Sequence, residues 1–350
     1  MTAEVVRPAG LRTPWVFVSV GTLVVVSLIS VLLGPANLAP FDVIKELLDR
    51  LPFIEIDSGL SDRQAAIVWV VRLPRVVLGA LVGAMLALAG AAYQGVFRNP
   101  LADPYLLGVA AGAGLGATMV IAFVPATTSW PIDPLPVAAF VGSLVGVGAT
   151  YLLGRSVRGG RSATTLILAG VAVAAFLTAA QTYVQQRETD TLRQVYAWIL
   201  GRLTTVGWGE VLLVLPYVAV STAVILAHRR LLDVLAVGDE EAQTLGLRTS
   251  TIRAIVIVAA SLGTAAVVAV SGLIGFVGII VPHTVRLLFG WSYRIVLPLA
   301  LFAGAAFLVT ADLLARTLTT PAELPIGIVT AFIGAPFFAM LLRSREALGS

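Results

Sequence analysis

The sequence predicts an all-α membrane protein with about ten transmembrane helices, organised as a single domain over residues 1–350. Two observations predict this fold class. Of the 350 residues, 58% are hydrophobic and only 12% are charged, a balance far from that of soluble globular domains. The apolar residues also gather in nearly uncharged runs of about 20, the length that a helix needs to cross a bilayer.

Ten apolar runs follow one another along the chain. The first comes after Arg7 and Arg12 and is longer than the roughly 7–15-residue core of a signal peptide, so we expect it to remain as a helix. Only a short Ser-Gly break near Ser271 separates the seventh run from the eighth. The membrane-spanning region covers residues 14–345, and the predicted spans are residues 15–33, 74–97, 104–123, 135–153, 162–185, 211–227, 252–270, 273–289, 295–311 and 324–342.

The positive residues predict the orientation, because cytoplasmic loops carry an excess of lysine and arginine. Ten spans with both termini cytoplasmic put 14 of the 23 lysines and arginines inside. We therefore expect a multi-pass protein of the cytoplasmic (inner) membrane. The net charge of +4 reflects this orientation, and no nucleic-acid partner is expected. The 14 residues are Arg7, Arg12, Arg98, Arg155, Arg158, Arg161, Arg229, Arg230, Arg248, Arg253, Arg286, Arg294, Arg343 and Arg345.

Small residues recur every four positions in the second and third spans. In lipid, small residues let helix backbones approach closely and gain dispersion contacts. The two stripes therefore predict tight helix packing and no chemistry. They are Gly79, Gly83, Ala87, Ala91 and Gly95 in the second span, and Gly108, Gly112 and Gly116 in the third.

The turn between these two spans reads "RNPLADPYLLG". Asn99-Pro100 is typical of turn initiation, and Asp103 followed by Pro104 is typical of a helix start. We expect Asp103 to cap the third span with Pro104 at its first helical position. Arg98 is expected at the inner membrane face, where it can pair with Asp103.

Several classes of function are excluded by what the sequence lacks. The chain has no cysteine, and its only lysine, Lys45, follows Ile44, so no Walker A motif exists. It also lacks the HExxH and GxSG motifs. We therefore predict a chain that is not an enzyme and has no metal site of its own. The centres of the predicted spans carry no Asp, Glu, Lys or Arg, which argues against an ion-coupled carrier. A gradient-driven secondary transporter or channel for a bulky solute remains the alternative.

A polar stripe lies on the outer half of the fifth span. Thr178, Gln181, Thr182 and Gln185 are spaced so that they share one helix face. Such a face avoids lipid. It can line a pathway or form hydrogen bonds with a neighbouring helix, and the spacing alone does not decide between these two arrangements.

The most polar inner loop contains "VGDEEAQTLGL" at residues 237–247. Asp239, Glu240 and Glu241 suit the first turn of a helix because the helix dipole favours acidic residues there, and Gly246 can end that helix. The segment predicts a short freestanding helix, which is either a partner contact or a solvated loop helix. Three arginines lie at the outer ends of two spans: Arg72 and Arg75 at the second, and Arg316 at the ninth. Taken alone, they are typical of interfacial anchors.

Several long motifs together resemble the FecCD family of permease subunits, which belong to ABC importers for iron–siderophore complexes, haem and cobalamin. The resemblance runs from about residue 72 to the C-terminus. The motifs are "RLPRVVLGALVGAMLALAGAAYQGVFRNPLADPYLLGVAAGAGLGA", "WILGRL", "GDEEAQTLGL", "GLIGFVGIIVPHTVRLLFG", "ADLLART" and "ELPIGIVTAFIGAPFF".

The resemblance implies a type II ABC importer permease architecture and a set of partners. The partners are a second copy of the chain, two cytosolic ATP-binding subunits, a substrate-binding protein outside the membrane, and membrane lipid. The chain itself would bind no cofactor, because ATP and Mg²⁺ would be used by the ATPase. Siderophore-iron, haem and cobalamin importers share these motifs, and no residue separates the cargoes.

The resemblance also implies roles for individual residues. The fifth and tenth spans would line a pathway on the dimer axis, with Ser162, Thr164 and Thr165 at an inner gate and the stripe of Thr178, Gln181, Thr182 and Gln185 further out. Arg72, Arg75 and Arg316 would pair with glutamates of the binding protein. The segment 237–247 would be the coupling helix, through Gly238, Asp239, Glu240, Glu241, Ala242, Leu245 and Gly246, with Leu247 as a further apolar contact.

Overall fold

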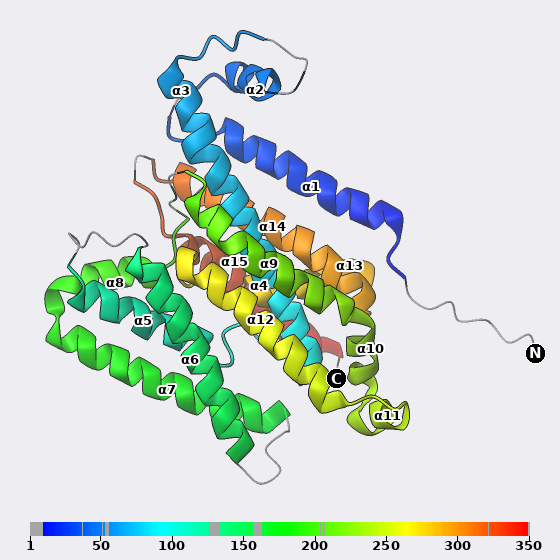
Figure 1. Ribbon diagram of the computed structural model, residues 1–350. Coiled ribbons are helices and arrows are strands. Elements are labelled where there is room, and N and C mark those ends of the chain that lie inside the picture. The colour runs from blue at the N-terminus through cyan, green and yellow to red at the C-terminus, as the bar shows by residue number, and fades with distance from the viewer. Residues whose placement is uncertain are drawn as a thin grey trace, which may run out of the picture.

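A computed structural model describes residues 10–36, 38–50, 52, 56–125, 133–156, 163–203, 205, 207–320 and 322–348, and the regular elements among them are all helices (Figure 1). Seven of these helices are long and apolar enough to cross a membrane, and three more are apolar but shorter. Together they match the ten predicted spans. They are α1 (Thr13–Leu32), α4 (Leu73–Phe97), α5 (Val109–Phe123), α6 (Pro134–Ser156), α7 (Ala163–Arg187), α9 (Gly209–Ala227), α12 (Thr249–Ser271), α13 (Val277–Phe289), α14 (Tyr293–Thr317) and α15 (Ile326–Leu348).

Shorter helices lie at the two ends of the bundle. The terminal face is the end where α1 begins and α15 finishes, and it carries α10 (Arg229–Val237) and α11 (Asp239–Thr244). The opposite face carries α2 (Pro40–Asp49), α3 (Asp62–Ala66), the 3₁₀ turn η2 (Thr189–Thr191) and α8 (Leu192–Ile199). The π-helical turn η1 (Ile67–Arg72) joins α3 to α4, so that one continuous helix runs from Asp62 to Phe97.

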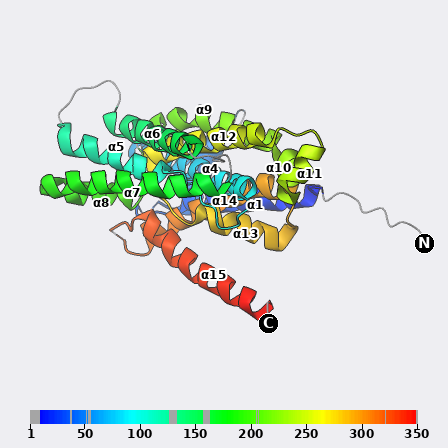
Figure 2. The ribbon, with the colours of Figure 1, turned by 90° about the horizontal axis from the view of Figure 1, so that it is seen from below.

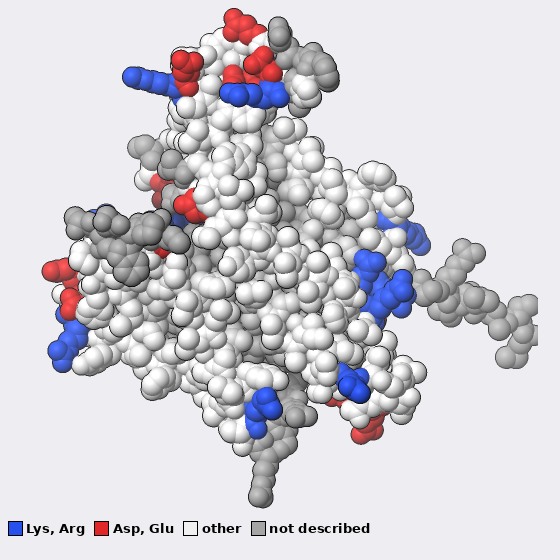
Figure 3. All heavy atoms as spheres, in the orientation of Figure 1, with Lys and Arg blue, Asp and Glu red and all other residues white. Residues whose placement is uncertain are grey.

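The charged residues also separate along the bundle. Figure 3 shows Lys, Arg, Asp and Glu at the ends and edges of the visible surface, with a broad band between them that carries none. Burying an unpaired charge in hydrocarbon is costly, so this band is the part of the surface suited to lipid.

The helix α4 forms the centre of the fold. It packs against α14, α12, α13 and α9, and most of its length is buried. A side chain at Gly83 would collide with the backbone of Gly304 in α14. A side chain at Gly112 of α5 would likewise collide with Gly142 of α6. These contacts confirm the close packing that the two small-residue stripes predict.

The third span begins later than predicted. The helix α5 starts at Val109 after Gly108, whose φ of +81° suits glycine, and residues 104–107 form a turn. Asp103 therefore does not cap this span, and Pro104 is not its first helical residue. The Oδ1 atom of Asp103 instead accepts a hydrogen bond from the Tyr105 backbone N–H at 2.8 Å. Asn99 behaves as predicted and accepts from Leu101 N–H at 2.9 Å, which closes the first part of the turn.

The predicted break between the seventh and eighth spans is present, and a residue far away in the chain forms hydrogen bonds with its backbone. Residues 272–276 are not helical, and Gly272 has a φ of +70°. The Tyr105 hydroxyl donates to the carbonyl of Ile274 and accepts from its N–H, both at 3.0 Å. The turn after α4 therefore satisfies the backbone that the break leaves open, as buried polar groups in a membrane require.

We expect Gly83→Ala to destabilise the protein and Gly148→Ala to stabilise it. The added methyl at position 83 overpacks the contact with α14, at a cost of about 1–3 kcal/mol. No atom lies near a side chain built at Gly148, so alanine there only improves helix propensity, by up to about 1 kcal/mol. Thermal unfolding of both variants in detergent measures this difference, and equal melting temperatures would contradict the assigned packing.

Candidate functional site

Charged and polar residues form two clusters, one at each end of α4. On the terminal face, α11 begins directly after Gly238 and ends at Thr244, and Gly246 just beyond it has a φ of +78°. The N–H of Gly246 donates to Gln243 at 2.9 Å, and that of Leu247 donates to Ala242 at 3.1 Å. The short helix predicted from its acidic first turn and closing glycine is therefore present.

Asp239 joins this short helix to two membrane helices. Its Oδ2 atom lies 3.0 Å from Nη2 of Arg98, and its Oδ1 atom lies 2.6 Å from Nη2 of Arg253. Arg98 follows α4 in a left-handed conformation with φ of 48°, and Arg253 belongs to α12. The predicted pairing of Arg98 with Asp103 is therefore wrong, because Arg98 reaches across to Asp239.

The remaining residues of α11 divide between core and surface. Ala242 is fully buried against the chain itself, so the expected contact of Ala242 with a partner is wrong. Leu245 is 70% exposed, and Glu240 and Glu241 are also exposed. The surface that α11 offers to another molecule is therefore an apolar side chain next to an acidic turn.

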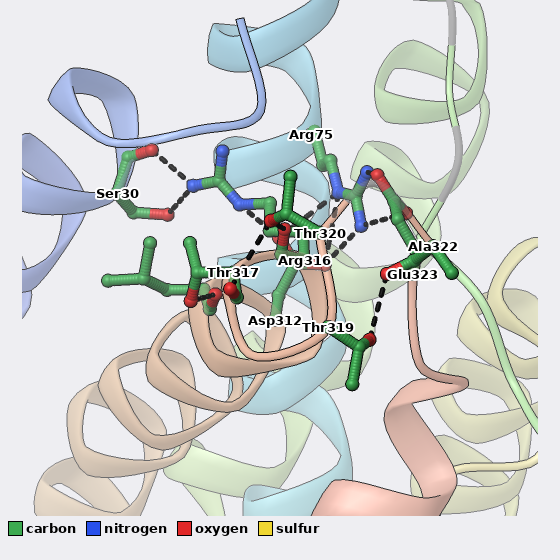
Figure 4. A network of polar contacts seen from close by, with 10 residues as sticks. Ser30, Arg75, Asp312, Arg316, Thr317, Thr319, Thr320, Ala322 and Glu323 are labelled. Carbon is green, nitrogen blue, oxygen red and sulfur yellow. Dashed lines mark hydrogen bonds and ion pairs between the residues drawn. The ribbon is translucent and has the colours of Figure 1, made fainter. Parts of the chain in front are cut away.

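The second cluster lies on the opposite face, where Arg75 and Arg316 share the carboxylate of Asp312 (Figure 4). Nη2 of Arg75 lies 2.8 Å from Asp312 Oδ1 and 2.9 Å from Glu323 Oε2. Arg316 Nε lies 3.5 Å from Asp312 Oδ2, and its Nη2 donates to the carbonyl and hydroxyl oxygens of Ser30. This cluster ties the ends of α1, α4 and α14 to the segment before α15.

The three arginines predicted to meet a binding protein do not all reach the surface. Arg72 and Arg316 are only 4% and 3% exposed. Arg72 donates to the carbonyls of Val31, Leu32 and Ala36, where α1 ends, whereas Arg75 turns to Asp312. Only Arg75 and its partner Glu323 lie near the surface. Sequence reasoning missed Asp312 and Glu323, although both stand in the "ADLLART" and "ELPIG" motifs.

The polar stripe of α7 is split by the structure. Gln181 is buried, and its amide lies next to the backbone of Gly114 in α5. For Gln181 the contact with a neighbouring helix is therefore the correct interpretation. Thr178 and Thr182 are exposed, Gln185 is half-buried, and Thr182 donates to the Thr178 carbonyl at 2.9 Å.

The predicted gate residues lie at the start of α7. Thr164 is exposed and Thr165 is half-buried, while Ser162 lies outside the described residues. Within the described part of the chain, no group of three or more His, Cys, Asp or Glu residues is arranged to hold a metal ion.

The family model of the FecCD transport family matches residues 22–344. The chain belongs to this family. It is 44% identical over 292 residues to a cobalamin import system permease of Halobacterium salinarum, covering 83% of this chain and 77% of the relative. It is 40% identical over 292 residues to the hemin transport system permease of Yersinia pestis, covering 80% and 84%.

A solved structure agrees with this assignment. An inward-facing conformation of a metal-chelate type ABC transporter superposes with a TM-score of 0.82 and 29% sequence identity, covering 95% of this chain and all of that one. The FecCD permease described here is thus a multi-pass membrane protein and the permease subunit of an ABC importer, not an enzyme. The architecture predicted from the sequence is confirmed.

We expect Asp312→Asn to destabilise this permease far more than Glu323→Gln. Asp312 is almost fully buried between two arginines, and breaking a buried ion pair costs about 3–5 kcal/mol because it leaves charge uncompensated. Glu323 is 36% exposed, so water screens its loss to below about 1 kcal/mol. Chemical unfolding in detergent compares the two variants. A larger effect at Glu323 would mean that Asp312 does not organise the cluster.

Proposed function

We propose that this FecCD permease imports a metal chelate into the cytoplasm, driven by ATP hydrolysis on two ATPase subunits that contact α11. The structure of α11 and its surroundings carries the proposal. Leu245, directly after α11, is exposed beside an acidic turn, and Asp239 in that turn forms ion pairs with Arg98 after α4 and Arg253 in α12. A short helix with this exposed surface can bind in a cleft of a partner protein. The ion pairs of Asp239 would then link that partner to the membrane helices. ATP and Mg²⁺ belong to the ATPase.

The terminal face is proposed to be cytoplasmic, with both termini on that side. The excess of arginine predicted for the cytoplasmic loops supports this orientation. Arg98, Arg155, Arg230 and Arg253 all lie at that end of the bundle. The membrane is then the cytoplasmic (inner) membrane.

The permease is proposed to act as a homodimer. Figure 2 shows α15 diverging from the rest of the bundle, so that much of its surface has no neighbour in the chain. Phe332 of α15 is 78% exposed, and Phe176 of α7 is also exposed. A second copy that covers α15 and α7 would put the exposed Thr178 and Thr182 along the pathway between the copies, with Thr164 and Thr165 near its cytoplasmic end.

A substrate-binding protein is proposed to dock on the opposite face at Arg75. Among the three predicted docking arginines, Arg75 lies nearest the surface, where Glu323 already binds it through a bidentate pair. A carboxylate of the binding protein would exchange with Glu323 and preserve the charge-assisted hydrogen bonds. Arg72 and Arg316 would support this contact by holding α1 and α14 in place.

The cargo class follows from what the relatives share. Their names include cobalamin, hemin and iron(3+)-citrate. Each is a metal held by an organic chelator, and this class is the cargo proposed here. The binding protein is expected to select among chelates, because the membrane helices offer mainly small and weakly polar side chains.

Reconstitution tests the function directly. Proteoliposomes that hold the permease, its ATPase and its binding protein should take up the chelate that the purified binding protein retains. Uptake should require ATP inside the vesicles and should fall when either partner is omitted. Uptake at the same rate under a proton or sodium gradient without the ATPase would replace the proposal with the gradient-driven alternative.

Two variants of α11 should separate assembly from coupling. Leu245→Asp puts a charge into the apolar contact and should reduce ATPase co-purification. Asp239→Asn weakens the charge-assisted bonds to Arg98 and Arg253 while the exposed surface stays intact, so the ATPase should still bind while uptake falls about tenfold. Normal uptake by Asp239→Asn would mean that the ion pairs do not transmit the movement of α11.

A further inference from the structure

A pocket of about 330 Å³ lies on the terminal face between the end of α6 and the starts of α7 and α12. The helix α6 packs against both of the others, and Figure 1 shows the three ends near one another at the bottom of the bundle. The polar residues that line the pocket are Arg155, Arg253, Ser250, Thr251 and Tyr151, and none of the described lining residues is acidic. Such a lining suits an anion.

The first turn of α12 contributes to the attraction. The first four N–H groups of a helix have no partner within it, and they give that end a partial positive charge. No side chain caps the start of this 23-residue helix. Ser250 and Thr251 lie in its first turn and line the pocket, so their hydroxyls can donate to one anion at the positive end of the helix. The Thr251 N–H is already used, because it donates to the Arg248 carbonyl at 3.0 Å.

Arg253 supplies an independent observation. Its side chain is more than nine-tenths buried, and Nη2 pairs with Asp239. Its Nε–H is also buried but has no hydrogen-bond partner among the residues that the structure describes. Buried donors are nearly always satisfied, so an unsatisfied guanidinium donor in the lining of a pocket points to an acceptor that the described residues do not supply.

The surroundings identify the class of that acceptor. Phosphate oxygens match the fork of an arginine, and a helix start with hydroxyls is a common phosphate site. The pocket lies where α6 ends and where α7 and α12 begin, and the apolar side chains of Leu166, Ala254 and Ile257 form the rest of its wall. We propose that this pocket binds the phosphate group of an anionic phospholipid, with the acyl chains along the apolar wall.

Native mass spectrometry of the full-length permease tests the site with phosphatidylglycerol and, for comparison, zwitterionic phosphatidylcholine. The wild type should bind phosphatidylglycerol more tightly. Arg155→Gln should weaken that binding about tenfold, as the loss of one charge-assisted hydrogen bond predicts. Ser250→Asp should abolish the preference for phosphatidylglycerol over phosphatidylcholine, because the new carboxylate would occupy the start of α12 and repel the phosphate. The same carboxylate interacts favourably with the dipole of α12, so the helix should remain stable.

Controls separate the site from general effects. Arg230→Gln removes an exposed arginine of α10 on the same face, outside the pocket, and should leave binding unchanged. The melting temperature of Ser250→Asp should equal or exceed that of the wild type, so lost binding would not reflect misfolding. Equal binding of phosphatidylglycerol by the wild type, Arg155→Gln and Ser250→Asp would overturn the proposal.

A third measurement distinguishes a lipid phosphate from free inorganic phosphate as the ligand of the pocket. Inorganic phosphate is added to the wild type in detergent, before and after phosphatidylglycerol. If the lipid stays bound in the presence of phosphate, the lipid assignment is supported. If free phosphate displaces the lipid completely from the wild type, the pocket is a site for free phosphate and the lipid assignment is wrong.

Discussion

Close contact between helix backbones is the constraint on which this structure depends. Apolar side chains gain little by leaving hydrocarbon, so membrane helices associate where small residues bring their backbones together. The helix α4 meets α14 in this way at Gly83 and Gly304, and α5 meets α6 at Gly112 and Gly142. Because α4 is buried among four other helices, the positions of its two ends are set by the packing of the whole bundle.

The two ends of α4 hold the two charged clusters. Arg75 near one end binds Asp312 and Glu323, and Arg98 after the other end binds Asp239. Each cluster joins α4 to elements that would contact a soluble partner on that face. A tightly packed helix with a salt-bridged contact at each end provides a physical connection between the two sides of the membrane. This connection is the basis for coupling in the proposed transport cycle.

The periphery of the bundle is built differently from its centre. The helices α7 and α15 expose large apolar side chains, and α15 makes few contacts within the chain. Thr178 and Thr182 of α7 are exposed on this periphery, whereas Gln181 of the same helix packs against α5. The part of the molecule proposed to form the pathway is therefore the part that a single chain leaves open.

The sequence by itself determined the features that depend on local pattern. Hydropathy places all ten membrane helices within a few residues, because a bilayer requires apolar runs of a given length. The small-residue stripes predict the tight contacts, and an acidic turn before Gly246 predicts α11. The family follows from motifs that are continuous in the chain.

Only the tertiary structure decided which distant groups meet. Arg98 binds Asp239 instead of Asp103, Arg72 turns to the end of α1 while Arg75 turns to Asp312, and Ala242 faces inward. Each outcome depends on a neighbour that lies far away in the chain. The periodicity of a helix shows which residues share a face, but the packing of the other helices determines what that face contacts.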